Sequence, residues 1–382
     1  MIDLENMSIL VVDDMKSMRL TIKKMLRNLN IGKTLLFADN GKKGLAILAD
    51  TPCDLAIIDW NMPVMNGSEM LNALRQDKGL RDMPVIMVTS ENERDIVSEV
   101  AEYEIDAYLL KPLTLESLDQ KIKSVVDNAN HPDACSQHLF QARELEEAGE
   151  FQGAIDALRQ ALVYKPSASR ILRKIGLLYI KINRVDIGVK CLKKAISVNK
   201  QDTASRNHLA QIYIQKKEYN NATKIYLQIL DLSQRYFGEA VRLGEHLMES
   251  GYKSEALDLF TKVIRRARRR SDLKHRIIDV ALAYRELDFA IGLMEQILIE
   301  NPSNCDLMFK TGDAYRNKGA CEKALTFFRN VDTKKKGDPA AKLEIAKIYH
   351  QQGRIYQADN YVRQVLRIDP ENEDALALRR EL

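Results

Sequence analysis

Residues 55–67 read LAIIDWNMPVMNG, an apolar run that ends abruptly on a carboxylate. The apolar residues 55–58 lead directly into Asp59, and Pro63 follows four positions later. A continuous apolar run of this length is typical of a strand that is buried on both faces of a parallel sheet. In open α/β sheets, ligands bind beyond the carboxyl ends of the strands. The position of Asp59 therefore predicts a functional site where this strand ends.

Four further apolar segments in the first 125 residues predict strands of the same sheet. They are residues 8–12, 34–38, 84–88 and 107–110. The segments between them have helical length and period, as in residues 16–29. Strands that alternate with amphipathic helices predict an α/β fold with a doubly wound, five-stranded parallel sheet.

Polar residues stand at the ends of four of these strands. Asp13 and Asp14 follow the first strand, Asp59 ends the third, Thr89 follows the fourth and Lys111 follows the fifth. Because parallel strands end at one edge of the sheet, we expect these side chains to converge. Three neighbouring carboxylates need a counter-charge, and Mg²⁺ prefers oxygen ligands of this kind. The pattern predicts phosphoryl transfer onto Asp59, with Mg²⁺, Lys111 and Thr89 stabilising the phosphoryl oxygens.

These motifs resemble the receiver domain of two-component response regulators, most closely that of the CheY type. The matching segments are residues 11–14 (VVDD), 57–67 (IIDWNMPVMNG), 88–91 (VTSE) and 107–112 (AYLLKP). The resemblance implies a flavodoxin-like receiver domain over residues 1–127, in which Asp59 accepts the phosphoryl group. It also implies that Asp14 and Asp59 bind Mg²⁺ directly, Asp13 through water, and Asn61 through its backbone carbonyl.

The same resemblance implies roles for residues around the metal. Lys111 would contact the phosphoryl group and precede a cis peptide bond to Pro112. Thr89 and Tyr108 would form a switch in which the hydroxyl moves toward the phosphoryl group and the aromatic ring turns inward. The switch would alter the surface around residues 93–103.

Asn61 and Glu91 occupy the positions that tune hydrolysis of the acyl phosphate in this family. The same pair occurs in regulators that lose phosphate quickly, so we expect a short-lived signal.

A repeat of 34 residues without insertion or deletion follows a predicted linker, residues 128–134. Small residues recur in the second predicted helix of every copy: Ala154, Gly188, Ala222, Ala256, Ala290, Ala324 and Ala358. Large apolar residues follow four positions later, which is the pattern of closely packed helical hairpins. The pattern resembles the tetratricopeptide repeat (TPR). It implies an all-α superhelical solenoid with seven repeats over residues 135–372 and a capping helix over residues 373–382.

Glycines mark four of the predicted turns between paired helices, where a left-handed residue ends a helix. They are Gly149, Gly251, Gly319 and Gly353. The fifth repeat departs from the pattern, because Ile278 replaces a small residue and Ala281 an aromatic one. Its first helix is expected to sit further out or to bend.

A basic run, RRARRR at residues 265–270, closes the fourth repeat, and a KKK run at residues 334–336 closes the sixth. The arginines that could face a partner are Arg265, Arg266, Arg268, Arg269 and Arg270. Solvated helix ends, which suit the helix dipole, are the first interpretation. An acidic protein partner is the second. Nucleic acid is disfavoured because no aromatic residue is interleaved with the arginines.

Composition and charge set the broad class. The first 125 residues carry a net charge of −5 and the remainder +9, which indicates two domains with different roles. The five cysteines are scattered and no apolar run is long enough for a membrane helix, so we expect a cytoplasmic protein.

We expect a response regulator, not an enzyme acting on an external substrate, that receives phosphate from a sensor histidine kinase or phosphotransfer protein. Phosphorylation would control protein binding by the TPR domain, and a homodimer is one form this control could take. Two alternatives remain open: a phosphorylation-controlled RNA-binding protein, and a static adaptor in which the receiver is a phosphate sink.

Overall fold

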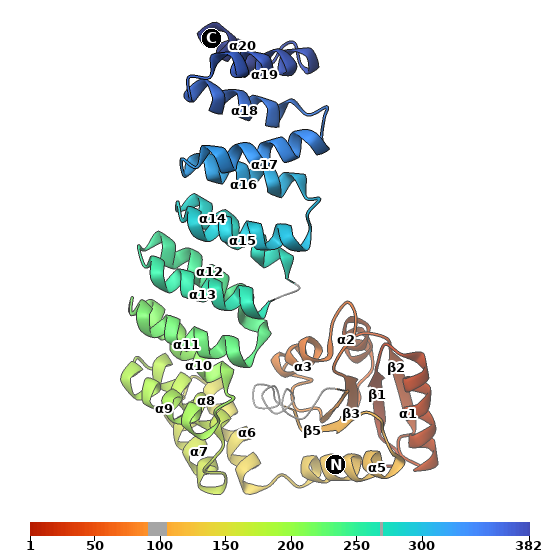
Figure 1. Cartoon of the computed structure of the whole chain (residues 1–382). Helices are drawn as coiled ribbons and strands as arrows, with labels where there is room; N and C mark the ends of the chain where they lie inside the picture. The colour runs from red at the N-terminus through yellow and green to blue at the C-terminus, as the bar shows by residue number, and fades with distance from the viewer. Residues whose placement is uncertain (91–104, 268–269) are drawn as a thin grey trace. The chain divides into compact units, whose positions relative to one another are not determined.

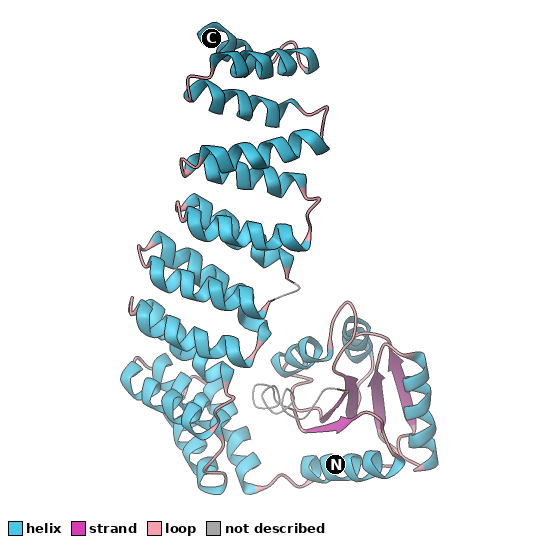
Figure 2. Cartoon of the chain, in the orientation of Figure 1, coloured by secondary structure: helices cyan, strands magenta, loops and turns pink. Residues whose placement is uncertain are grey.

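The computed structural model describes residues 1–90, 105–267 and 270–382 of the chain (Figure 1). The chain divides into two compact units, Met1–Leu232 and Ser233–Leu382. Within the described residues, all strands lie between residues 8 and 110 and the rest of the regular structure is helical (Figure 2). No helix in these ranges is both long and apolar enough to cross a membrane.

The first unit begins with a five-stranded parallel sheet, as the sequence predicts. Its strands are β1 (Ser8–Val12), β2 (Thr34–Ala38), β3 (Leu55–Asp59), β4 (Val85–Thr89) and β5 (Ala107–Leu110). They are arranged in the order β2-β1-β3-β4-β5. The order reverses at β1 and β3, and ligands of doubly wound sheets bind at such a switch point. Thr89 is the last residue of β4 instead of following it, and it pairs with Leu110.

Helices cover both faces of this sheet. Side chains of α1 (Lys16–Asn28) and α5 (Leu115–Asn130) form one core with alternate residues of the strands. Those of α2 (Gly41–Asp50) and α3 (Gly67–Gln76) form a second core with the other set. Because β3 is fully buried between the two cores, its last residue, Asp59, is held in place by packing on both sides.

Helical hairpins make up the rest of the chain and confirm the predicted solenoid. In the first unit they are α6 (Ala134–Glu147) with α7 (Phe151–Tyr164), α8 (Ser169–Lys181) with α9 (Val185–Val198), and α10 (Thr203–Gln215) with α11 (Tyr219–Leu232). In the second unit they are α12 (Phe237–Glu249) with α13 (Lys253–Arg266), α14 (Ser271–Ala283) with α15 (Leu287–Glu300), α16 (Cys305–Asn317) with α17 (Cys321–Lys334), and α18 (Pro339–Gln351) with α19 (Ile355–Ile368). The short η1 (Gln234–Tyr236) precedes α12, and α20 (Glu373–Glu381) follows α19.

The turns inside the hairpins all contain a residue with positive φ, spaced by 34 positions. Four are the predicted glycines, and the other three are Asn183, Lys217 and Arg285. The left-handed conformation that ends each first helix is thus kept even where a side chain makes it less favourable.

Close packing inside the hairpins explains the small residues of the repeat. A Cβ atom added to Gly244 would lie 2.3 Å from the ring of Phe260, so only glycine lets these two helices approach as they do. In the fifth repeat, Ile278 and Ala281 are both fully buried. These two residues therefore belong to the core although they depart from the repeat pattern.

Candidate phosphoryl-transfer site

Three carboxylates meet at the carboxyl edge of the sheet. Asp59 ends β3, while Asp13 and Asp14 follow β1 directly. Carboxylate oxygens of the three lie within 4.8 Å of one another. Asp13 and Asp59 are buried, whereas Asp14 is exposed to solvent. The cluster therefore combines two fixed carboxylates with one that is open to solvent.

The ammonium of Lys111 lies between the two buried carboxylates. Its Nζ is 3.0 Å from Oδ2 of Asp13 and 2.8 Å from Oδ1 of Asp59. Burial pulls the pKa of Lys111 down, but the hydrogen bonds to both aspartates outweigh it and leave that pKa raised. Burial also raises the pKa of Asp59, and the charge of Lys111 offsets this only in part. Lys111 thus supplies the positive charge that two buried acids require.

The two predicted switch residues differ in burial, because Thr89 is buried and Tyr108 is partly exposed. Thr89 is buried at the end of β4, and its carbonyl accepts a hydrogen bond from the backbone N–H of Lys111 at 2.8 Å. Tyr108 lies on β5 with 37% of its surface exposed, and the ammonium of Lys121 on α5 lies 6.0 Å from the centre of its ring. The peptide bond between Lys111 and Pro112 is cis, as expected.

Arg19 supports the cluster from α1, a contact that the strand-end pattern does not reveal. Its guanidinium donates hydrogen bonds to the backbone carbonyls of Asp13 at 2.6 Å and Asp14 at 3.1 Å. The carboxylate of Asp13 in turn accepts from the backbone N–H of Met15 at 2.8 Å. These bonds fix the turn that carries the two acids.

The other predicted site residues are exposed to solvent or lie outside the described residues. Asn61 is exposed in the loop between β3 and α3. Glu91 and residues 93–103 lie outside the described residues, as do Arg268 and Arg269. Arg265 and Arg266 are exposed at the end of α13, and Arg270 forms an ion pair of 2.8 Å with Asp272.

The donor set fits Mg²⁺. Three carboxylates that converge on one another at a solvent-accessible edge are ligands that a hard divalent cation prefers, and the exposed side of Asp14 leaves room for water molecules. Asp13, Asp14 and Asp59 would hold the ion, with the backbone carbonyl of Asn61 as a further ligand. Bound there, Mg²⁺ would neutralise charge on phosphoryl oxygens.

Gly67 is required by the close approach of α3 to the end of β3. A Cβ atom at this position would lie 2.2 Å from the carbonyl oxygen of Asp59. We expect Gly67→Ala to displace Asp59, to destabilise the fold by about 1–3 kcal/mol, and to weaken Mg²⁺ binding. Trp60, the single tryptophan of the chain and the neighbour of Asp59, allows Mg²⁺ titration by fluorescence.

Gly79→Ala is the matched control, because its Cβ would meet only the side chain of Asp77, at 3.3 Å. Equal Mg²⁺ affinity in the two variants would contradict the role assigned to Gly67.

Comparison with known proteins agrees with this geometry. The family model for the response regulator receiver domain matches residues 9–123, and tetratricopeptide repeat models match residues 141–186, 203–246 and 317–382. The chemotaxis protein CheY of Pseudomonas aeruginosa is 40% identical over 124 residues, which are 32% of this chain and 99% of that protein.

Two solved structures are also similar to parts of the chain. CheY4 of Vibrio cholerae is 28% identical with a TM-score of 0.30, over 31% of this chain and 98% of that one. YrrB, described as a TPR protein with an unusual peptide-binding site, is 21% identical with a TM-score of 0.34, over 50% of this chain and 99% of that one.

A five-stranded parallel sheet with a cluster of carboxylates at its edge defines the receiver class, and the chain belongs to the response regulator receiver family. It is a response regulator in which the receiver domain is followed by TPR repeats.

Proposed function

We propose that the protein is a cytoplasmic response regulator whose receiver domain, residues 1–127, controls protein binding by TPR repeats over residues 135–372. The phosphoryl group would come from a sensor histidine kinase or phosphotransfer protein and be accepted by Asp59. The observation that carries the proposal is the position of the Lys111 ammonium, 2.8 Å from Asp59 and 3.0 Å from Asp13. A fixed cation between an acceptor and a second acid suits transfer of an anionic group.

The proposed chemistry uses these positions, together with the roles that the resemblance to receiver domains implies for Thr89, Tyr108, Asn61 and Glu91. An oxygen of the Asp59 carboxylate attacks phosphorus, the bond from phosphorus to the donor's imidazole nitrogen breaks, and that nitrogen keeps the electron pair. Lys111 then pairs with the phosphoryl oxygens instead of with the free carboxylate. The hydroxyl of Thr89 donates to one of these oxygens, and Tyr108 follows it inward. Asn61 and Glu91 set how fast water removes the group. No external substrate is turned over.

Ion pairs within the first unit support communication between the two parts. Arg81, between α3 and β4, pairs with Glu147 of α6, and Arg143 of α6 pairs with Asp82. The side chains of Arg81 and Arg143 are 18% and 21% exposed, and those of their partners Glu147 and Asp82 are 36% and 55% exposed. Partly covered ion pairs of this kind couple more strongly than fully solvated ones. They give the first hairpin a direct contact with the receiver.

The proposal is tested by affinity capture with the full chain. Wild-type protein carrying Mg²⁺ and beryllofluoride, a phosphoryl mimic, is compared with untreated protein and with Asp59→Asn. Bound proteins and bound RNA are both identified. We expect at least one protein partner to be gained or lost only with the mimic. Identical partners in all three samples would contradict the proposal and support a static adaptor whose receiver is a phosphate sink. RNA that binds only with the mimic, without a protein partner, would contradict it in favour of an RNA-binding regulator.

A further inference from the structure

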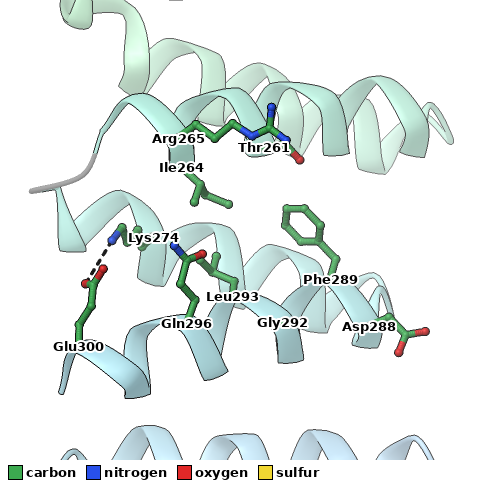
Figure 3. A pocket seen from close by; sticks show the side chains of 10 residues that line it. All are labelled: Thr261, Ile264, Arg265, Lys274, Asp288, Phe289, Gly292, Leu293, Gln296 and Glu300. Carbon is green, nitrogen blue, oxygen red and sulfur yellow. Dashed lines mark ion pairs between the residues drawn. The ribbon is translucent and has the colours of Figure 1, made fainter. Parts of the chain in front are cut away.

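A groove in the second unit lies between α13, α14 and α15 (Figure 3). Ile264 and Phe289 point into it from α13 and α15, and Leu293 lies beside them. The ring of Phe289 also packs 6.4 Å from that of Phe260, measured between centroids. The polar and charged lining residues are Thr261, Arg265, Lys274, Asp288, Gln296 and Glu300. The groove thus joins an apolar wall to charged side chains.

Lys274 is an unusual lining residue, because it is a buried cation with little compensation. Only 6% of its surface is exposed. Its single ion pair within the described part of the chain joins Nζ to Glu300 over 3.6 Å, and 62% of the Glu300 side chain is exposed. A lysine whose side chain is largely buried normally has a close, hydrogen-bonded partner for its ammonium. The ammonium of Lys274 therefore retains capacity to bind an anion in the groove.

The seventh repeat shows how this chain satisfies a lysine at the same repeat position. Lys342, two repeat lengths after Lys274, is also buried, and it pairs directly with Asp332 on the preceding helix. The residue at the position of Asp332 two repeats earlier, on the helix that precedes α14, is Ile264 of the fourth repeat. The fifth repeat therefore has a buried lysine too, but an apolar wall of the groove stands where a carboxylate would pair with it.

The remaining charges leave the groove positive at this end. Arg265 is exposed and forms no ion pair within the described ranges. Asp288, at the other end, is already paired with Lys318, which follows α16. Among the described residues, Glu300 is the carboxylate that forms an ion pair with Lys274. The free charge therefore complements an acidic ligand, since opposite potentials across an interface favour binding.

Gly292 leaves space on α15 beside the apolar wall. A Cβ atom added there would meet no atom within 4 Å. An apolar side chain of a ligand can cover Phe289 and Leu293 through this opening, and the resulting burial is favourable.

We propose that this groove binds a short segment of a partner protein in which a carboxylate stands next to a large apolar residue. The carboxylate pairs with Lys274 and Arg265, and the apolar side chain packs over Gly292 against Phe289. The proposal rests on the TPR repeats being the protein-binding output, and it does not require that phosphorylation controls the groove.

The test begins with a display library of random short peptides, selected on the full wild-type chain without a phosphodonor. We expect enrichment of peptides that combine Asp or Glu with Leu, Phe or Trp. One enriched peptide is then labelled with fluorescein, and its affinity for each variant is measured by anisotropy.

Lys274→Met should weaken binding about ten- to a hundredfold, because a charge-assisted contact is lost while the apolar stem is kept. Ile264→Asp should do the same by giving Lys274 the internal partner that Lys342 has. Gly292→Leu should fill the space that the apolar side chain of the peptide occupies, without disturbing α15. Lys190→Met, an exposed lysine on α9, and Gly238→Leu, a second glycine with open space, should leave affinity unchanged.

Two results would overturn the inference: selected peptides without acidic residues, or affinity that is equal in wild type, Lys274→Met and Gly292→Leu. Displacement of the peptide by oligouridylate at physiological salt would instead assign the basic end to RNA and also overturn it. Repeating the titration with Mg²⁺ and beryllofluoride separates the two proposals. A peptide affinity that the mimic does not change would contradict control of this groove by Asp59, but it would not contradict peptide binding in the groove.

Discussion

Asp59→Asn is expected to abolish phosphorylation of the full-length chain. The amide that replaces the carboxylate has no anionic oxygen to attack phosphorus. Incubation with Mg²⁺ and acetyl phosphate, followed by mobility on a phosphate-affinity gel, should show a shifted band for wild type and none for the variant.

Asp39→Asn is the control for this experiment. Asp39 is a partly exposed acid of the same domain that pairs with Lys43 at 2.7 Å and is not one of the three clustered carboxylates. Its variant should be phosphorylated as wild type is. A shifted band that persists in Asp59→Asn would show that another residue accepts the phosphoryl group and would refute the assignment.

Asp202→Ala is expected to cause the largest loss of stability among the solenoid residues considered. Asp202 is fully buried and begins α10, where its Oδ1 accepts hydrogen bonds from the guanidinium of Arg173 on α8 at 2.7 Å and from the backbone N–H of Ser205 at 2.8 Å. Its Oδ2 accepts from the hydroxyl of Ser205 at 2.7 Å. Removing the carboxylate takes an ion-pair partner at 2.7 Å away from the buried guanidinium of Arg173 and costs about 3–5 kcal/mol.

Hydrogen exchange in α8–α10 of the full chain measures this loss as faster exchange of amides that open with that part of the solenoid. Asp186→Ala is the control, because Asp186 is 92% exposed and its ion pair with Lys216 spans 3.6 Å. Such a surface pair contributes at most about 1 kcal/mol. Equal exchange in the two variants would mean that Arg173 finds other partners.

Most of the fold follows from two strong and independent features of the sequence, the polar residues at the strand ends and the 34-residue repeat. Strand ends that carry Asp13, Asp59 and Lys111 place three charges at one edge of a parallel sheet, and the structure brings these three side chains into contact. The repeat likewise predicts the hairpins, since each helix must bury its small and large residues against its neighbours.

What the sequence does not reveal depends on partners that are distant along the chain. Arg19 belongs to a regular amphipathic helix, and only the folded turn shows that it binds the backbone of Asp13. Lys217 and Arg285 adopt the left-handed conformation because the surrounding hairpin imposes it, against their intrinsic preference. Lys274 lies at a core position of the repeat, and its missing partner becomes apparent only beside Lys342 and Asp332.

The pairing of Lys342 with Asp332, and the isoleucine at the matching position beside Lys274, have a consequence for how such arrays diversify. A lysine that is paired with the preceding copy is inert, and copying that pair along the array adds length without adding specificity. The six other copies carry leucine or isoleucine at the position of Asp332, so a lysine introduced beside such a residue must be satisfied from outside, while the neighbouring copies keep their packing. Recognition can therefore be acquired copy by copy during evolution, through single replacements that the shared scaffold tolerates.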